Sequence, residues 1–206
     1  MTGVWPEPAY VVRTERLEIR CYERRDVRSL HQEVLDNVDA LLPWMPWVEH
    51  EPLTLEDRGT LVRTFRAKFD AGENFFYGIF ERDGSRLLGG CGLHPRVGSG
   101  ALEIGYWIVQ DRWGEGLATE VAMALTRVGF ERMRAERIEI RVAPDNDRSL
   151  AVPVKLGYRR EGTLRAALPI GPGRESLVVF GMLEHELAES PAANIDLEIE
   201  GFMSHA

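Results

Sequence analysis

The sequence predicts a mixed α/β domain with a sheet of about seven strands flanked by four helices. Apolar residues alternate with a period of two in several short segments, which indicates strands, and recur with a helical period in others. The predicted order is one strand, two helices, three strands, a helix, a strand, a helix and two strands. An antiparallel meander followed by helix-crossed strands is typical of a mixed sheet covered by helices.

Local patterns define the elements of the first half. Alternating apolar and charged residues predict a half-buried first strand. Asp26 and Thr54 are suitable N-caps for two amphipathic helices. Two prolines exclude a helix between them, so Trp44 and Trp47 lie in a loop. The Asp-Gly pair at 83–84 predicts a tight hairpin turn. The expected elements are strand 16–22, helices 26–37 and 54–72, and strands 75–80 and 86–93.

The second half continues with a strand that leads through a Gly-Glu-Gly turn into a helix with an apolar stripe, which is typical of packing on a sheet. A later short helix contains Pro153, which lacks the N–H that the Ser149 carbonyl would accept. We expect a bend or widened turn there that frees this carbonyl. The expected elements are strand 101–109, helix 114–132, strand 137–142, helix 147–156, and strands 158–164 and 177–183.

Composition limits the classes of function. The chain has 206 residues and a formal charge of −8, which suits one domain and argues against a nucleic-acid partner held on a basic surface. No apolar run approaches the roughly 18–20 residues of a membrane span. Cys21 and Cys91 are far apart and no secretory leader is evident, so a cytoplasmic location is expected. The five histidines have no metal-ligand spacing, so no metal is expected.

Three segments are expected along the chain. Residues 1–13 are predicted to be an N-terminal arm, because prolines are frequent there. Residues 14–187 contain every predicted element of the domain. Residues 188–206 are predicted to be a poorly ordered C-terminal tail.

The turn at 113–119 predicts a phosphate site. Gly114 and Gly116 lack a Cβ, so the backbone can turn sharply and bring several N–H groups against a ligand. The helix that begins there adds its unpaired donors and the positive end of its dipole. A nucleotide P-loop is not supported, because the Gly-Lys-Ser/Thr ending is absent. A dinucleotide fingerprint requires a small third residue where Thr119 stands and an acid after the next strand.

A second group of polar residues follows the next strand. Asn146 and Ser149 are three residues apart, so they share one face of the helix that they begin, and Leu-Gly-Tyr follows at 156–158. In order, the chain has a strand, a Gly-x-Gly-x-Ala helix, a second strand, an Asn-x-x-Ser helix and Leu-Gly-Tyr. This order resembles the GNAT superfamily of N-acetyltransferases. Four further motifs resemble its ribosomal-protein N-acetyltransferase branch: Thr-Glu-Arg-Leu-x-Ile-Arg at 14–20, Leu-Pro-Trp-x-Pro-Trp at 42–47, Glu-Ile-Gly-Tyr-Trp at 103–107 and Glu-Gly at 161–162.

The resemblance, which covers 14–187, implies an acetyl-CoA-dependent enzyme that transfers acetyl directly to a primary amine in a ternary complex. It implies that the sheet is splayed at its centre, between 101–109 and 137–142, and that acetyl-CoA enters there. Backbone groups near Trp107 would bond the pantetheine, and the amides of the glycine turn would hold the pyrophosphate. The implied cofactor-binding residues are Trp107, Ile108, Val109, Trp113, Gly114, Glu115, Gly116, Leu117, Ala118, Thr119, Asn146 and Ser149.

Transfer needs a neutral amine, a polarised thioester carbonyl and a proton for the departing thiolate. By the resemblance, Ser149 donates to the sulfur, and Asn146 holds the pantetheine arm or a water. Capping the helix is an alternative role for Asn146. Two carboxylates compete for the role of base: Glu103 by its position on the strand beside the acetyl group, and Glu161 by resemblance. Both remain open.

The acceptor is not determined by these motifs. Trp44 and Trp47 are expected to wall an acceptor pocket, although plugging the edge of the core is an alternative role. A peptide N-terminus fits the ribosomal branch; an antibiotic, a polyamine or an amino acid remains an alternative, as does a non-catalytic acyl-CoA-binding module. The resemblance also implies a homodimer in which strand 177–183 contributes an edge.

Overall fold

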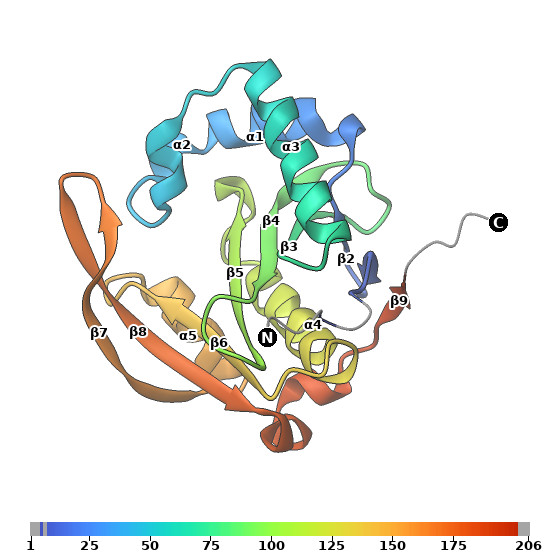
Figure 1. Cartoon of the computed structure of the whole chain (residues 1–206), viewed down its shortest axis with the longest axis vertical. Coiled ribbons are helices and arrows are strands. Elements are labelled where there is room, and N and C mark those ends of the chain that lie inside the picture. The colour runs from blue at the N-terminus through green and yellow to red at the C-terminus, as the bar shows by residue number, and fades with distance from the viewer. Residues whose placement is uncertain (1–4, 6–7, 202–206) are drawn as a thin grey trace.

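The structure, a computed structural model, describes residue 5 and residues 8–201. It contains one nine-stranded sheet in the order β7-β8-β6-β5-β4-β3-β2-β1-β9 (Figure 1). The strands are β1 Val11–Arg13, β2 Leu17–Cys21, β3 Phe75–Glu81, β4 Leu87–His94, β5 Ala101–Ile108, β6 Arg137–Val142, β7 Arg159–Ile170, β8 Gly173–Leu183 and β9 Glu198–Glu200. The mixed α/β sheet predicted from the sequence is confirmed.

Helices cover both faces of the sheet. The α-helices are α1 Val27–Asp36, α2 Val38–Leu41, α3 Leu55–Asp70, α4 Leu117–Glu131 and α5 Asp147–Lys155. Short 3₁₀ helices are η1 Arg24–Asp26, η2 Pro46–His50, η3 Gln110–Arg112, η4 Glu184–Glu189 and η5 Pro191–Asn194. Helices α1 and α3 pack together on β2, β3 and β4, whereas α4 packs on β4, β5 and β6 and contacts α5 (Figure 1). None of the helices in these residues has the length and apolarity that a bilayer span requires.

The centre of the sheet is splayed, as the resemblance implies. Strands β5 and β6 run parallel, and α4 forms the crossover between them. Their pairing begins at Ala101 and Arg137 and ends at Ile104 and Ile140, although β5 continues to Ile108. The two strands therefore part at the ends that lead into α4 and α5.

The prediction of seven strands and four helices was too low. Strands β1 and β9, with three residues each, pair with one another, and β1 also pairs with β2. Strands this short do not produce a detectable alternation. Helix α2 has four residues and follows α1 almost directly, so its pattern merges with that of α1. Part of the predicted N-terminal arm therefore belongs to the sheet.

The C-terminal segment differs from the poorly ordered tail that was predicted. Residues up to 201 run back along α4 and end in β9 at the far edge of the sheet. The Arg127 guanidinium donates to the Ile195 carbonyl at 2.6 Å, and the Ser190 hydroxyl donates to the Leu156 carbonyl at 2.7 Å. These polar anchors hold a segment that has little apolar periodicity of its own. The rest of the predicted tail, 202–206, lies outside the described residues.

The last hairpin is longer than the sequence predicts. Strand β7 continues to Ile170 and β8 begins at Gly173, so the residues between the two predicted strands form most of a protruding hairpin. Strand β8 lies between β7 and β6 and is not an edge, which corrects the prediction for 177–183. The edge strands are β7 and β9.

Candidate active site

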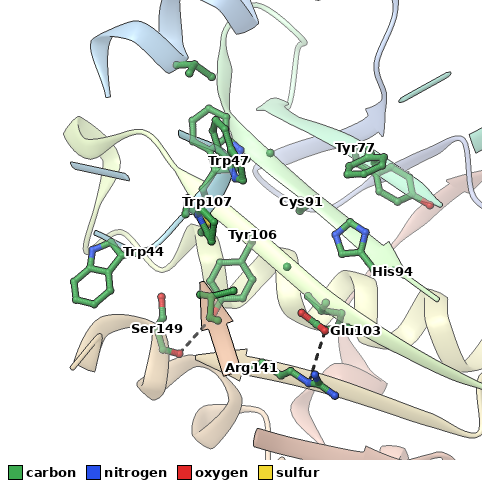
Figure 2. A pocket seen from close by; sticks show the side chains of 18 of the residues that line it. Trp44, Trp47, Tyr77, Cys91, His94, Glu103, Tyr106, Trp107, Arg141 and Ser149 are labelled. Atoms are coloured by element: carbon green, nitrogen blue, oxygen red, sulfur yellow. Dashed lines mark hydrogen bonds and ion pairs between the residues drawn. The ribbon is translucent and has the colours of Figure 1, made fainter. Parts of the chain in front are cut away.

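A cavity of about 750 Å³ opens where β5 and β6 part (Figure 2). Its walls come from the exposed ends of β4, β5 and β6, from the start of α5, from α1 and α3, and from the segment around η2. Predicted site residues that line it are Trp44, Trp47, Glu103, Trp107, Asn146 and Ser149. Segments that are distant in sequence therefore converge on the splay.

One wall of the cavity has glycines in place of side chains. In the β4–β5 ladder, Gly90 lies opposite Trp107, Gly92 opposite Gly105, and His94 opposite Glu103. Residues two apart on a strand face the same side of a sheet, so these six positions share one face. Two of the glycines are covered by side chains, because a Cβ on Gly90 would meet the Trp107 indole and one on Gly92 would meet the His94 ring. Gly105 lies beside the His94 ring and lines the cavity.

Glu103 is 7% exposed and is held by two arginines. The Arg96 guanidinium donates to both of its carboxylate oxygens, at 3.0 and 2.5 Å. Arg141, from the end of β6, lies 3.8 Å away and also bonds Glu139 at 2.8 Å. Figure 2 shows Glu103 and Arg141 facing one another at the lower edge of the cavity. The carboxylate is therefore fixed in orientation beside the splay.

Glu161 lies elsewhere. It is not among the residues that line the cavity, and it forms an ion pair with Arg137 at the opposite end of β6, with one contact at 2.8 Å. The Arg137 hydrogen bond holds the pKa of Glu161 below its ordinary value. The two glutamates left open by the sequence thus occupy different environments, and only Glu103 borders the cavity.

Ser149 and Asn146 begin α5 at the cavity wall. The Asn146 side-chain oxygen accepts from the Ser149 backbone N–H at 3.1 Å, so Asn146 caps the helix. Helix α5 runs through Pro153 without a break, so the widened turn expected there is not present. The Ser149 carbonyl is not free either: the Tyr106 hydroxyl donates to it at 3.4 Å (Figure 2). A side chain from β5 replaces the backbone donor that proline lacks.

The predicted phosphate turn has the backbone that its sequence requires. Gly114 and Gly116 have φ values of 87° and 81°, in the left-handed region that favours glycine. Helix α4 begins at Leu117, with Gly116 as its N-cap. A Cβ placed on Gly114 would have no other atom within 4 Å, so the turn is open on that side. The free amides at the start of α4 therefore face an accessible surface.

The opening motif of the chain holds this turn in place, a role that the sequence did not suggest. The hydroxyl of Thr14 donates to the buried Glu120 carboxylate at 2.5 Å. Arg16 bonds the same carboxylate at 2.5 Å and donates to the Glu115 carbonyl at 3.0 Å. The segment before β2 thus fixes the first turn of α4.

Trp113 packs between the turn and α5. Its indole N–H donates to the Ile108 carbonyl at 2.7 Å, and the Arg148 guanidinium lies 4.9 Å from its ring centroid. The Val109 N–H donates to the Leu88 carbonyl at 2.9 Å. Two backbone groups that the resemblance offers to the cofactor are therefore bonded within the protein.

The tryptophans predicted to wall an acceptor pocket do face the cavity. The Trp47 ring lies 6.1 Å from that of Trp107, centroid to centroid, and Trp44 lies nearby (Figure 2). Trp107 is the cross-strand partner of Gly90, so this aromatic wall adjoins the glycine positions of the β4–β5 ladder.

His94 is the residue near the splay that sequence reasoning missed. Its ring is 7% exposed, lines the cavity, and its Nδ1 lies 2.6 Å from the Asn74 side-chain oxygen. Burial, together with the nearby Arg96 charge, lowers the pKa of His94 to about 3. It lies one residue beyond the strand predicted at 86–93, and the register of β4 with β5 places it opposite Glu103. Among the described residues no cluster of His, Cys, Asp or Glu is suited to hold a metal ion.

Comparison with known proteins agrees with this arrangement. Residues 16–159 match the family model of the GNAT acetyltransferase domain. The chain is 30% identical over 174 residues to Bacillus subtilis YdaF, provisionally named a ribosomal N-acetyltransferase, covering 84% of this chain and 93% of that protein. It is 28% identical over 160 residues to the Escherichia coli [ribosomal protein uS5]-alanine N-acetyltransferase, covering 75% of this chain and 81% of that protein.

A solved structure shares both the fold and part of the sequence. Mycobacterium smegmatis RimJ in complex with a CoA disulfide superposes with a TM-score of 0.78 at 25% identity, covering 94% of this chain and 95% of that chain. The splayed sheet, the glycine turn before α4 and the family match lead to one conclusion. The chain belongs to the GNAT family of N-acetyltransferases, in the group that resembles RimJ and RimL.

Proposed function

We propose that this N-acetyltransferase transfers the acetyl group of acetyl-CoA to the N-terminal amine of a protein. The observation that carries the proposal is the end of parallel pairing at Ile104 and Ile140, beside a cavity lined by Ser149 and Glu103. The relatives named as ribosomal-protein N-acetyltransferases support a protein acceptor. The CoA disulfide bound to the M. smegmatis relative supports the cofactor.

The chain offers matching features for acetyl-CoA. The amides of 113–119 suit a pyrophosphate, because an open left-handed glycine turn leads into a helix whose first donors are unpaired. Arg148, stacked on Trp113, adds a positive charge next to this turn. Asn146 and Ser149 line the cavity itself. This arrangement lets a protein with a formal charge of −8 hold an anionic cofactor.

Acetyl-CoA supplies an acetyl group activated as a thioester, and transfer forms a C–N bond to the amine, breaks the C–S bond and releases CoA as a thiol. The acceptor ammonium loses two protons in the process. Glu103 accepts one, directly or through water, and passes it to solvent, which leaves a neutral amine able to attack. The Ser149 hydroxyl relays the other to the departing sulfur. Glu161 takes no part in this scheme, because it does not line the cavity.

The aromatic wall suits a charged amine on its way to the reaction centre. An ammonium over the face of Trp47 or Trp107 gains about 0.5–2 kcal/mol of cation–π attraction. Beyond these rings the cavity is lined by apolar side chains of α1 and α3, among them Leu30, Val34 and Phe65. This combination suits an amine attached to an apolar group.

A small-molecule amine is the second candidate acceptor. The Glu49 carboxylate accepts a hydrogen bond from the Gly171 N–H, which joins the η2 segment to the tip of the β7–β8 hairpin. Both segments contribute other residues to the cavity wall, so this contact ties two parts of that wall together. A wall held together in this way favours a small acceptor over a bulky one.

A turnover assay with acetyl-CoA distinguishes the two acceptors. The panel comprises peptides with a free N-terminal alanine or serine, the same peptides with a blocked N-terminus and an internal lysine, polyamines and aminoglycosides. We expect release of CoA thiol and acetylation of the α-amine only with the free peptides, assigned by fragment mass spectrometry. Turnover confined to the small amines would refute the protein acceptor and support the second candidate.

Variants of the acid and base candidates test the assigned roles. Ser149→Ala and Glu103→Gln are each expected to lower kcat by about 100-fold or more, the usual contribution of a positioned proton donor or acceptor. Glu161→Gln is the matched comparison. A larger loss in Glu161→Gln than in Glu103→Gln would reverse the assignment of the base. Acetyl-CoA affinity, measured by calorimetry, separates loss of chemistry from loss of binding.

A further inference from the structure

The His94 imidazole covers Gly92 and reaches the cavity beside Gly105. A Cβ placed on Gly92 would lie 2.6 Å from His94 Nε2, and one on Gly105 would lie 3.5 Å from it. The Nε2 edge of the ring thus lies above two glycines that are partners across the β4–β5 ladder. Figure 2 shows the ring directed toward the cavity, between Cys91 and Glu103.

A hydrogen bond sets which ring nitrogen carries the proton. His94 Nδ1 lies 2.6 Å from the Asn74 side-chain oxygen, and an amide oxygen can only accept. The proton therefore resides on Nδ1, and Nε2 carries a lone pair directed to the cavity. With a pKa lowered to about 3 by burial and by Arg96, the ring remains neutral near pH 7.

His94 Nε2 is an uncharged hydrogen-bond acceptor among aromatic and charged neighbours. The Phe76 ring from β3 lies 5.1 Å from the imidazole, centroid to centroid. The charged neighbours are Glu103, directly opposite on β5, and Arg96, whose guanidinium is bonded to both Glu103 oxygens. The cavity edge therefore presents a neutral nitrogen acceptor beside a carboxylate whose oxygens already accept from arginine.

We propose that His94 is a catalytic residue whose Nε2 accepts a hydrogen bond from the N–H of the acceptor amine, and that Asn74 is the positioning residue that holds the ring in this tautomer. The inference rests on the proposed function, which supplies the amine. One N–H of the amine donates to Nε2, and this orients the nitrogen lone pair past Gly105 toward the splay. The proton that leaves the amine passes to Glu103, since a ring with so low a pKa does not retain it.

Nitrogen NMR of the histidine-labelled full chain tests the proposal without turnover. We expect His94 to show a protonated Nδ1 and a bare Nε2, and Asn74→Ala to mix the two tautomers. In the presence of CoA, a peptide with a free N-terminal alanine should shift the Nε2 resonance, and the same peptide with an acetylated N-terminus should not. A protonated Nε2, or no shift with the free peptide, would overturn the proposal.

Kinetics provide the second test. His94→Phe should lower kcat/KM for the peptide about three- to tenfold, as expected for one lost hydrogen bond, while KM for acetyl-CoA stays within twofold. His94→Gln, whose side-chain oxygen can accept, should recover part of the loss. His185→Gln, on the exposed η4, is the matched control, and thermal unfolding identifies any variant that fails to fold.

The two proposals fail in different ways. If the wild type acetylates peptides and His94→Phe matches it in both kcat and peptide KM, the role of His94 is overturned and the proposed function stands. If the wild type acetylates no peptide, the proposed function fails, and the NMR titration still decides whether an amine bonds His94.

Discussion

Gly92 and Gly105, which are cross-strand partners beside His94, allow a sharp prediction. Adding one methyl group should impair stability at Gly92 and activity at Gly105. Gly92→Ala would place a Cβ 2.4 Å from His94 Cε1 and 2.9 Å from the Phe75 carbonyl oxygen. Real Cβ contacts are not this short, so both the imidazole and the β3 backbone must move. Gly105→Ala would place its Cβ 3.5 Å from His94 Nε2, an ordinary van der Waals contact.

The expected magnitudes follow from these distances. Overpacking of this kind costs about 1–3 kcal/mol, so Gly92→Ala should be destabilised by this amount, with Tm lower by about 2–4 °C per kcal/mol. Gly105 has no positive φ, and alanine at such a position is neutral or stabilising by up to about 1 kcal/mol. Its methyl group, however, projects into the cavity beside His94, where it should lower peptide kcat/KM by about 10- to 100-fold through displacement of the amine.

Urea unfolding and peptide acetylation, measured on both variants and the wild type, test this reasoning. The expected result is a stable but slow Gly105→Ala and an unstable Gly92→Ala. Two outcomes would refute the reasoning: wild-type stability in Gly92→Ala, or full activity in Gly105→Ala. The second would mean that the acceptor does not approach across this wall.

Three further predictions concern pH and packing. His94 is protonated near its ordinary pKa of 6.5 in the unfolded state and only near 3 in the folded state. The free energy of unfolding should therefore fall on acidification between these two pH values, by at most about 1.4 kcal/mol per pH unit. Urea unfolding at several pH values should show a weaker pH dependence in His94→Gln. Tyr106→Phe should lower the free energy of unfolding by about 1–3 kcal/mol, because it leaves the Ser149 carbonyl without a donor. In a Pro153→Ala background the loss should be smaller, because residue 153 then supplies a backbone N–H. Equal losses in the two backgrounds would contradict the role of Tyr106. Glu161→Gln should lower the free energy of unfolding by no more than about 1 kcal/mol near pH 7, because the ion pair with Arg137 lies at the surface. This difference from the wild type should vanish as pH falls below the ordinary carboxylate pKa of 4.5, because the ion pair requires the charged form of Glu161.

Much of the fold was predictable because its signals are local. The N-cap at Thr54 accepts from the Asp57 N–H at 3.1 Å, as its position before an amphipathic helix suggested. The apolar stripe of α4 is fully buried at Val121, Leu125 and Val128. Capping, glycine turns and amphipathic periods depend on residues within one or two turns, so a single sequence reveals them.

The missed features depend on distant partners. The three residues of β9 become a strand because β1 presents a free edge, and no local pattern encodes that encounter. The consequence of Pro153 was misjudged for the same reason. The residue that bonds the orphaned Ser149 carbonyl, Tyr106, is 43 positions away in the sequence.

For the site, the sequence was enough to predict the glycine turn before α4, the helix that begins at Asn146 and Ser149, and the family to which these motifs belong, while the cap by Asn146 was one of two roles left open. Only the tertiary structure decided which glutamate borders the cavity and that His94 stands opposite it. Backbone conformation follows from the steric and hydrogen-bonding preferences of neighbouring residues. The meeting of Glu103, His94 and Ser149 follows instead from strand register and from the point at which β5 and β6 stop pairing, which many long-range contacts determine together.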